Sequence, residues 1–312
     1  MTLMRYCSSG REFNLTQMNI EMVIDMSWTQ TDKTKAITTK ESAKGQYALR
    51  KEAMLQQIKE SQENNKSFLC LGIWGEPKSA KSATAMDILT DEDIKNGLHV
   101  LVFDFDNRAI DVKRNHYDNI ENLIVYNPIV RKDGSLVDFD ETMNNARAFY
   151  EMAKEYLDDG KLKAVIVDGA DKLLTDVCET KMREKHGMDA DTVIKQPPYV
   201  WGDRNTPYKN FLHKQILEMP CHRIVIAHSK DKYGGNPNPI GVEANWHSTT
   251  EDIFTATVRM SRDIRKNGAT FTAMVEASAR KPEMIGKRLK VLTIEDGKID
   301  WTGFPEIKSG EL

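Results

Sequence analysis

The sequence predicts an α/β protein with a mostly parallel sheet, helices on both faces and a C-terminal β-hairpin extension. Runs such as SFLCLGIW and KAVIVDGA are apolar almost throughout, and segments with helical patterning separate them. Strands of this kind lie in parallel sheets that are covered on both faces. After residue 250 the pattern changes to pairs of strand-like runs around KNG and EDG, which indicates hairpins.

The elements are expected in a fixed order along the chain. Residues 29–45 are polar and rich in Thr and Lys, which indicates a linker or exposed arm, and residues 46–60 predict a helix with one apolar face. Strands are then expected at 67–74, 98–106, 122–128, 163–170 and 222–230. Helices are expected at 80–89, with the helical segment ending near the KNG at 95–97, and at 140–160, 171–187 and 206–219. The hairpins span 252–282 and 287–303.

This order predicts two parts of unequal size. Residues 1–64 form an N-terminal arm and helix, which is a candidate oligomerisation segment, and residues 65–312 form one α/β domain.

The composition is that of an ordinary globular chain. It has 312 residues, of which 40% are hydrophobic and 29% charged, with a net charge of −3. No apolar run approaches the roughly 18 residues of a membrane span, and the N-terminal residues contain no apolar signal segment. The four cysteines are scattered and form no CxxC pair, which argues against a zinc site or a disulfide framework. We therefore expect a cytoplasmic protein without membrane contact, located in the host cytoplasm if it is viral.

Two long irregular stretches interrupt the α/β pattern. Residues 185–207 and 229–248 each run well beyond the usual connection of roughly 4–6 residues. The second directly follows a predicted strand, and the first is expected at the same edge of the sheet. Ligands bind at the carboxyl edge in open α/β sheets, so both stretches are candidate binding loops.

The stretch GEPKSAKS, residues 75–82, differs at one position from the phosphate-binding pattern G-x-x-x-x-G-K-[ST]. A predicted strand precedes it and a helix follows, as the pattern requires. Lys81 is expected to reach the β- and γ-phosphates of ATP, and the Ser82 hydroxyl to bind Mg²⁺. Ala80 replaces the second glycine. Because this position begins the helix, we expect alanine to be tolerated and Gly75 to be less replaceable. Nucleotide contacts are expected from Gly75, Glu76, Pro77, Lys78, Ser79, Ala80, Lys81, Ser82 and Ala83.

Polar side chains end three other predicted strands. Asp168 follows the run AVIV in the Walker B form and would hold Mg²⁺. Asp104 and Asp106 in LVFDFD lie on one face if the strand continues, and either could polarise the attacking water. His228 ends IVIAH, where it could sense the γ-phosphate. Each aspartate alone is more often a cap or turn residue, and the histidine alone is more often a satisfied edge residue, but their occurrence together in this order predicts NTP binding.

A basic segment lies near the C-terminus. Residues 259–290 hold nine Lys or Arg residues against three acids, although the whole chain is slightly acidic. Such a face can bind phosphate groups, or it can simply be the solvated side of a hairpin. Charge alone leaves both interpretations open.

With these residues identified, the chain resembles the RecA-like ATPases over about residues 65–292. GEPKSAKS is similar to the family's Walker A loop, and AVIVDGADKLL to its Walker B strand. VFDFDNRAID resembles the segment with the catalytic carboxylate. The resemblance implies that Asp106 orients the water, one methylene shorter than the usual glutamate, with Asp104 as the second candidate. IVIAHSKDKYG resembles the strand before the family's second DNA-binding loop, so His228 stands where glutamine is common.

The resemblance also implies an assembly. The closing hairpin of the family carries basic residues that reach the nucleotide of a neighbouring subunit, and Arg280 and Lys281 stand in the similar segment ASARKP. A ring or filament is the implied arrangement. Within the family, the likeness is greatest to phage and archaeal-virus proteins of the recombination, single-strand annealing type.

The implied function is Mg²⁺-dependent ATP hydrolysis coupled to single-stranded DNA in recombination, annealing or replication, with phage or viral recombination or replication proteins as further partners. Charges beside stackable rings suit single strands. The DNA-binding candidates in the two long stretches are Lys195, Tyr199, Arg204, Lys230, Lys232 and Tyr233. The rings of Trp201 and Trp246 lie in the same stretches, where they either stack on bases or pack on the core. The alternative functions are a hexameric helicase-type or packaging motor, and a nucleotide-dependent structural protein with little hydrolysis.

Overall fold

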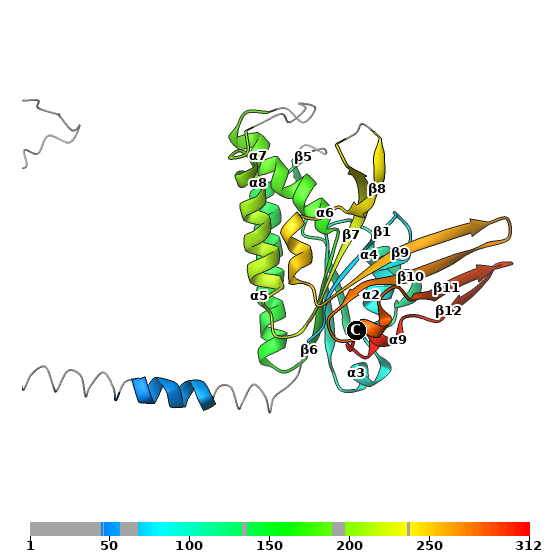
Figure 1. Ribbon diagram of the computed structural model, residues 1–312, viewed down its shortest axis with the longest axis horizontal. Coiled ribbons are helices and arrows are strands. Elements are labelled where there is room, and N and C mark those ends of the chain that lie inside the picture. Colours follow the sequence, from blue (N-terminus) through cyan, green and yellow to red (C-terminus); the bar gives the residue numbers. More distant parts are fainter. Residues whose placement is uncertain (1–44, 46, 57–67, 133–135, 189–196, 236–237) are drawn as a thin grey trace, which may run out of the picture. The chain divides into compact units, whose positions relative to one another are not determined.

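The computed structural model describes residues 45, 47–56, 68–132, 136–188, 197–235 and 238–312 (Figure 1). By its internal contacts the chain divides into two units, Met1–Lys66 and Ser67–Leu312. In the first unit, residues 47–56 are helical with exposed side chains, within the helix predicted at 46–60. The remainder of the predicted N-terminal arm lies outside the described residues.

A central sheet organises the second unit. Within the described part of the chain it has ten strands, in the order β12-β11-β10-β9-β1-β7-β6-β2-β3, with β8 paired to β7. From β3 to β9 the neighbours are parallel, whereas β9 to β12 are antiparallel. The strands are β1 (Cys70–Gly75), β2 (His99–Asp104), β3 (Leu123–Tyr126), β6 (Leu162–Asp168), β7 (His222–Tyr233), β8 (Pro239–Ala244), β9 (Ala256–Arg265), β10 (Gly268–Ser278), β11 (Arg288–Glu295) and β12 (Lys298–Trp301). A separate two-stranded ribbon pairs β4 (Arg131–Lys132) with β5 (Leu136–Val137).

Helices cover both faces of the parallel part, as Figure 1 shows. One apolar core packs the first face against α5 (Phe139–Asp158), α6 (Ala170–Lys172), the π-helical segments η1 (Leu173–Cys178) and η2 (Lys209–Ile216), α7 (Glu179–Lys185) and α8 (Trp201–Tyr208). A second core packs the other face against α2 (Lys81–Met86), α3 (Asp91–Lys95), α4 (Ala109–His116) and α9 (Pro305–Lys308). Short 3-10 turns complete the unit at η3 (Ser248–Ile253) and η4 (Pro282–Met284).

Alternate side chains of the strands pack into the two apolar cores. Phe103 and Val165 point into the first core, and Val102 and Ile166 into the second. This alternation makes β2 and β6 apolar on both sides, which is the pattern that predicted a covered parallel sheet. The α/β class and both C-terminal hairpins are therefore confirmed.

Two predicted irregular stretches are partly regular. Within residues 185–207, α8 begins at Trp201 and runs through Pro207 into η2, so the helix predicted at 206–219 starts earlier and is π-helical in its second half. Within residues 229–248, β7 continues to Tyr233 and pairs antiparallel with β8. The helix α4 was not predicted. Among the described helices, none has the length and apolar character that crossing a bilayer needs.

Candidate functional site

The loop after β1 is the starting point of the site. Gly75 ends the strand with a φ of +152°, and a Cβ atom there would collide with the carbonyl oxygen of Met260 on β9. Only glycine fits this close approach, because a side chain would push β1 away from its neighbour. The prediction that Gly75 is poorly replaceable therefore has a steric reason within the sheet.

Ala80 differs from expectation in its backbone. The helix does begin here, but Ala80 has φ 64° and ψ 21°, which is the left-handed conformation. An L-residue with a Cβ atom is strained in this region, whereas glycine adopts it freely. Glycine suits the second glycine position of the pattern because the backbone there is left-handed. In this chain, Ala80 adopts that left-handed conformation in its place. Lys78 is also left-handed, with φ 60°.

Lys81 lies inside the loop. Its side chain is buried, and its ammonium donates to the carbonyl oxygens of Gly75 at 3.2 Å and Glu76 at 2.6 Å. Burial lowers the pKa of Lys81, while the nearby carboxylates of Asp168, Asp171 and Asp106 oppose that effect. The ammonium is thus held at the centre of the loop.

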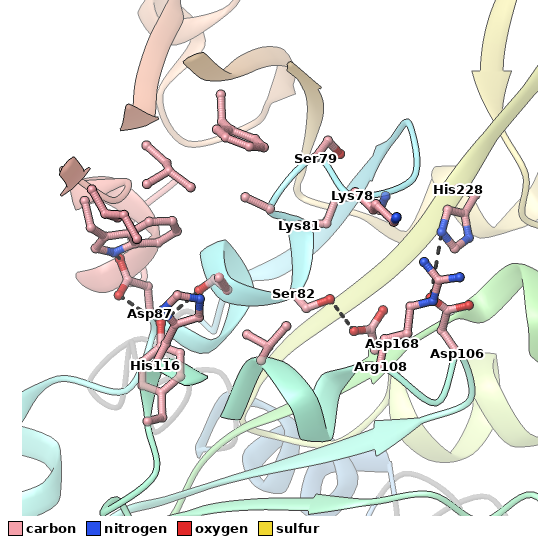
Figure 2. Close-up of a pocket in the computed structure, with 18 residues that line it drawn as sticks. Lys78, Ser79, Lys81, Ser82, Asp87, Asp106, Arg108, His116, Asp168 and His228 are labelled. Carbon is pink, nitrogen blue, oxygen red and sulfur yellow. Dashed lines mark hydrogen bonds and ion pairs between the residues drawn. The ribbon is translucent and has the colours of Figure 1, made fainter. Parts of the chain in front are cut away.

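Ser82 and Asp168 meet at the end of two strands. The Ser82 hydroxyl donates to Asp168 Oδ2 at 2.5 Å, as Figure 2 shows. Burial is the main cause that raises the pKa of Asp168 to about 7; the hydroxyl of Ser82 lowers it, and the carboxylates of Asp104 and Asp106 raise it further. A buried carboxylate with a raised pKa gains from a cation beside it. Among the described residues, no group of three or more His, Cys, Asp or Glu side chains is arranged to hold a metal ion, so an ion here would take other oxygen ligands as well.

Asp104 and Asp106 separate from one another. Strand β2 ends at Asp104, whose buried carboxylate accepts hydrogen bonds from the backbone N–H groups of Arg108 at 3.1 Å and Ile110 at 3.3 Å. Asp104 thereby fixes the start of α4 and does not line the cavity. Asp106 does line it, 3.6 Å from Arg108 Nε. The two carboxylates were expected on one strand face only if the strand continued, and β2 instead ends at Asp104.

His228 reaches the cavity from β7, where its Cα lies opposite Gly75. Its Nδ1 lies 3.0 Å from Asp171 Oδ2. Its Nε2 lies 3.8 Å from Asp106 Oδ2, and Figure 2 shows these two side chains. The sequence did not single out Asp171, although it follows Asp168 by three residues.

A cavity of about 510 Å³ joins these residues to an apolar wall. The wall comes from the hairpin strands, from α4 and from the residue that follows α4, and its members are Val112, His116, Tyr117, Phe271, Leu292, Ile299 and Trp301. None of these was predicted as a site residue, because the pairing of β10, β11 and β12 brings them beside a loop that is distant in sequence.

Asp87 forms hydrogen bonds with two aromatic residues of the wall. It accepts a hydrogen bond from Trp301 Nε1 at 3.0 Å and from the Tyr117 hydroxyl at 3.4 Å, and it pairs with Lys308 at 3.1 Å. Burial raises the pKa of Tyr117, so the phenol stays a hydrogen-bond donor. Two rings from different elements are therefore held at one side of the cavity.

Arg280 and Lys281 do not approach the loop at residues 75–82 of their own chain. Arg280 donates to the carbonyl oxygens of Gly310 and Phe68, and Phe68 precedes β1 whereas the loop follows it. Lys281 pairs with Glu311 at 3.0 Å. Strand β10 runs antiparallel to β9, and its end therefore returns to the amino edge of the parallel strands.

The predicted DNA-binding residues have different surroundings. Tyr199 is 76% exposed, and Lys232 and Tyr233 are exposed on the β7–β8 hairpin. Lys230 on the same hairpin pairs with Glu243 at 3.5 Å. Arg204 lies over the Trp201 ring and pairs with Glu179 at 3.5 Å, so its charge is engaged within the chain.

Two further candidates remain. Trp246 is buried against Phe254 and cannot stack on a base as it stands. Lys195 lies outside the described residues.

Together, β1, the loop at residues 75–82 and α2 have the strand–loop–helix order that a phosphate-binding loop requires, and they border the cavity. No protein-family model and no curated protein matches the chain. Among solved structures, it is similar to a KaiC-like protein from the hyperthermophilic archaeon Pyrococcus horikoshii, with 13% identity, a TM-score of 0.45, and 74% of this chain and 88% of that chain covered. It is also similar to a RadB recombinase, with 13% identity, a TM-score of 0.42, and coverage of 77% and 94%.

Proposed function

We propose that the chain is a RecA-like ATPase that binds ATP and Mg²⁺ in this cavity and hydrolyses the β,γ-phosphoanhydride bond. The observation that carries the proposal is the meeting of Lys81, Ser82 and Asp168 beside one cavity. An ammonium, a hydroxyl and a carboxylate at the end of β1 and β6 supply a charge for the phosphates and oxygen ligands for a metal ion. The apolar wall around Trp301 suits the flat base of a nucleotide.

The donor set fits Mg²⁺. This ion prefers oxygen ligands and is usually held by one or two carboxylates together with waters and substrate phosphates. Ser82 and Asp168 would hold it, and the ion would restore the ionised form of Asp168 that burial disfavours. When bound, Mg²⁺ neutralises charge on the β- and γ-phosphates.

The chain's own residues would do the remaining work. Lys81 would exchange its contacts with the loop carbonyls for phosphate oxygens. Asp106 would orient the attacking water, and Arg108 at 3.6 Å would hold that carboxylate in place. Positioning and electrostatic stabilisation supply most of the catalysis in phosphoryl transfer.

ATP hydrolysis by the purified full chain tests the proposal. We expect Mg²⁺-dependent turnover that Lys81→Ala abolishes, with loss of nucleotide binding, and that Asp106→Asn abolishes with binding retained. Lys95→Ala is the matched control, because Lys95 is an exposed residue at the end of α3. Turnover that survives Lys81→Ala would remove this cavity from the reaction, and unchanged turnover in Asp106→Asn would remove Asp106 from its role.

Single-stranded DNA is the proposed second ligand. The β7–β8 hairpin continues the strand that carries His228 and exposes Lys232 beside Tyr233, a charge next to a ring. We expect DNA to stimulate hydrolysis, and Lys232→Ala with Tyr233→Ala to remove the stimulation while basal turnover stays. Lys161→Ala serves as the control, since Lys161 is exposed just before β6. Stimulation that persists in the double variant would move DNA to another surface.

Self-association in a ring or filament belongs to the same proposal, as does a cytoplasmic role beside recombination or replication proteins. Lys281, with one ion pair at the surface, is the better candidate for a contact with a neighbouring subunit's nucleotide, because Arg280 already binds two backbone carbonyls. Light scattering with and without ATP would test the assembly. A monomer under both conditions would contradict it.

A nucleotide-dependent structural protein with little hydrolysis is the second candidate. The strained Ala80 and the short Asp106 side chain paired with Arg108 favour it. Nucleotide binding without turnover, with or without DNA, would decide for this candidate.

A further inference from the structure

Asp171 is a buried carboxylate beside the cavity that no step above uses. Its side chain is 4% exposed, and both of its oxygens face His228. Oδ1 accepts the backbone N–H of His228 at 3.2 Å, and Oδ2 lies 3.0 Å from Nδ1 of the ring. The Asp171 carboxylate therefore holds both the backbone and the imidazole ring of His228.

The local sequence D-G-A-D places this carboxylate. Gly169 follows Asp168 with φ +86°, and a Cβ atom there would lie 2.8 Å from the backbone nitrogen of Asp106. A side chain at this position would force the end of β6 away from the segment after β2. Glycine permits the close approach, which brings Asp106 and Asp171 within reach of His228 from opposite sides.

The contact also selects a tautomer. An ionised carboxylate only accepts hydrogen bonds, so the ring nitrogen that faces it must carry the proton. With Nδ1–H held by Asp171, Nε2 of the neutral ring has its lone pair available. Nε2 lies on the cavity side, 3.8 Å from Asp106 Oδ2.

We propose that Asp171 is a positioning residue that fixes His228 in the Nδ1-protonated tautomer, so that Nε2 accepts the proton of the attacking water. The inference rests on the proposed ATPase function. The water oxygen bonds to the γ-phosphorus while the bond from that phosphorus to the β,γ-bridging oxygen breaks, which leaves ADP and inorganic phosphate. The water proton passes to Nε2, and the imidazolium returns it to phosphate or solvent. Asp106 orients the water through a hydrogen bond.

Asp171→Asn tests the inference with little change in shape. The asparagine can turn its amide N–H toward Nδ1 and so favour the opposite tautomer, as happens when the orienting carboxylate of a Ser-His-Asp triad is replaced by an amide. General-base catalysis contributes roughly 10²–10⁴-fold, so we expect kcat to fall between about tenfold and 10³-fold. KM and the affinity for ATP should stay within about twofold, which a general loss of structure would not give.

Two companion variants separate positioning from packing. Asp176→Asn is the matched control: Asp176 lies in η1, pairs with Lys172 at 3.6 Å and does not line the cavity, so kcat should not change. His228→Gln should lower kcat about as much as Asp171→Asn. The double variant of Asp171 and His228 should lose no more than His228→Gln alone, because Asp171 acts through the ring.

A spectroscopic readout is independent of turnover. The ¹⁵N resonances of the His228 ring in the nucleotide-bound chain should show a protonated Nδ1 and an unprotonated Nε2, and this assignment should reverse in Asp171→Asn. A wild-type ring protonated only at Nε2 overturns the inference, and so does Asp171→Asn with kcat within twofold of wild type. If Asp171→Asn does not fold, the wild-type spectrum and His228→Gln decide. If the wild type binds ATP without hydrolysing it, the enzymatic proposal fails and the spectrum alone decides the tautomer that Asp171 selects.

Discussion

Ala80→Gly restores the second glycine of the phosphate-binding pattern and should stabilise the protein. Ala80 has φ 64°, and this left-handed conformation costs a residue with a Cβ atom roughly 1–2 kcal/mol. Glycine also raises the conformational entropy of the unfolded chain, which lowers the free energy of unfolding by about 0.4–1 kcal/mol and offsets part of this gain. The free energy of unfolding should therefore rise by about 0.8 kcal/mol, the centre of a range of roughly 0–1.6 kcal/mol, and this central value corresponds to a Tm increase of about 2–3 °C in a domain of this size.

Urea unfolding followed by circular dichroism measures this change, and Ala85→Gly provides the matched control. Ala85 is buried inside the same helix, α2, where glycine should destabilise by about 1–2 kcal/mol through lost helix propensity and a lost buried methyl group. The two variants make the same chemical change with opposite expected signs. If Ala80→Gly lowers the free energy of unfolding as Ala85→Gly does, the left-handed strain at Ala80 is refuted.

The remaining predictions concern the buried carboxylate and the two sides of the cavity. Asp168 has a folded-state pKa of about 7 against an ordinary value of 3.8, so the folded chain binds the proton more tightly. The free energy of unfolding of the metal-free protein should thus fall as pH rises from about 4 to 7. Asp168→Asn or added Mg²⁺ should flatten the slope of this free energy against pH. An equal slope in the variant would contradict the raised pKa of Asp168. Trp301→Ala removes an aromatic wall and one hydrogen bond to Asp87, and should weaken ATP binding about tenfold in calorimetry, an effect of about 1.4 kcal/mol. Unchanged affinity would place the base elsewhere. Gly75→Ala forces β1 from Met260 and should cost more than about 2 kcal/mol of unfolding free energy, whereas a cost below 1 kcal/mol would show that β1 and β9 can separate.

Local patterns predicted the elements that local physics controls. The loop at 75–82 was predicted together with its strand and helix, because its turn and its charged residues are adjacent in sequence. Helix α4 was missed because its sequence AIDVKRNH is mostly polar and shows no clear apolar face. Its start is fixed by Asp104, a contact that appears only once the strand has ended.

Long-range pairing decided the rest. The position of Arg280 depends on the direction in which β10 runs. A hairpin pattern in the sequence predicts the pairing of two strands, but it does not say where their ends lie relative to the loop at residues 75–82. The wall at Trp301 depends on three successive antiparallel pairings from β9 to β12. The role of Asp171 depends on the register that sets Gly75 opposite His228. Each of these facts joins residues that are far apart in the chain, and no local pattern contains them.

The wall at Trp301 has a consequence for synthesis on the ribosome. The loop at residues 75–82 follows β1, which pairs with β7 and β9, whereas the ring that closes the other side of the cavity belongs to β12, near residue 301. A nascent chain can therefore present the folded loop once β9 has emerged and before β12 completes the cavity. Nascent chains arrested before β12 should bind the phosphate groups without the base, and high-affinity ATP capture should begin only when the last hairpin leaves the exit tunnel.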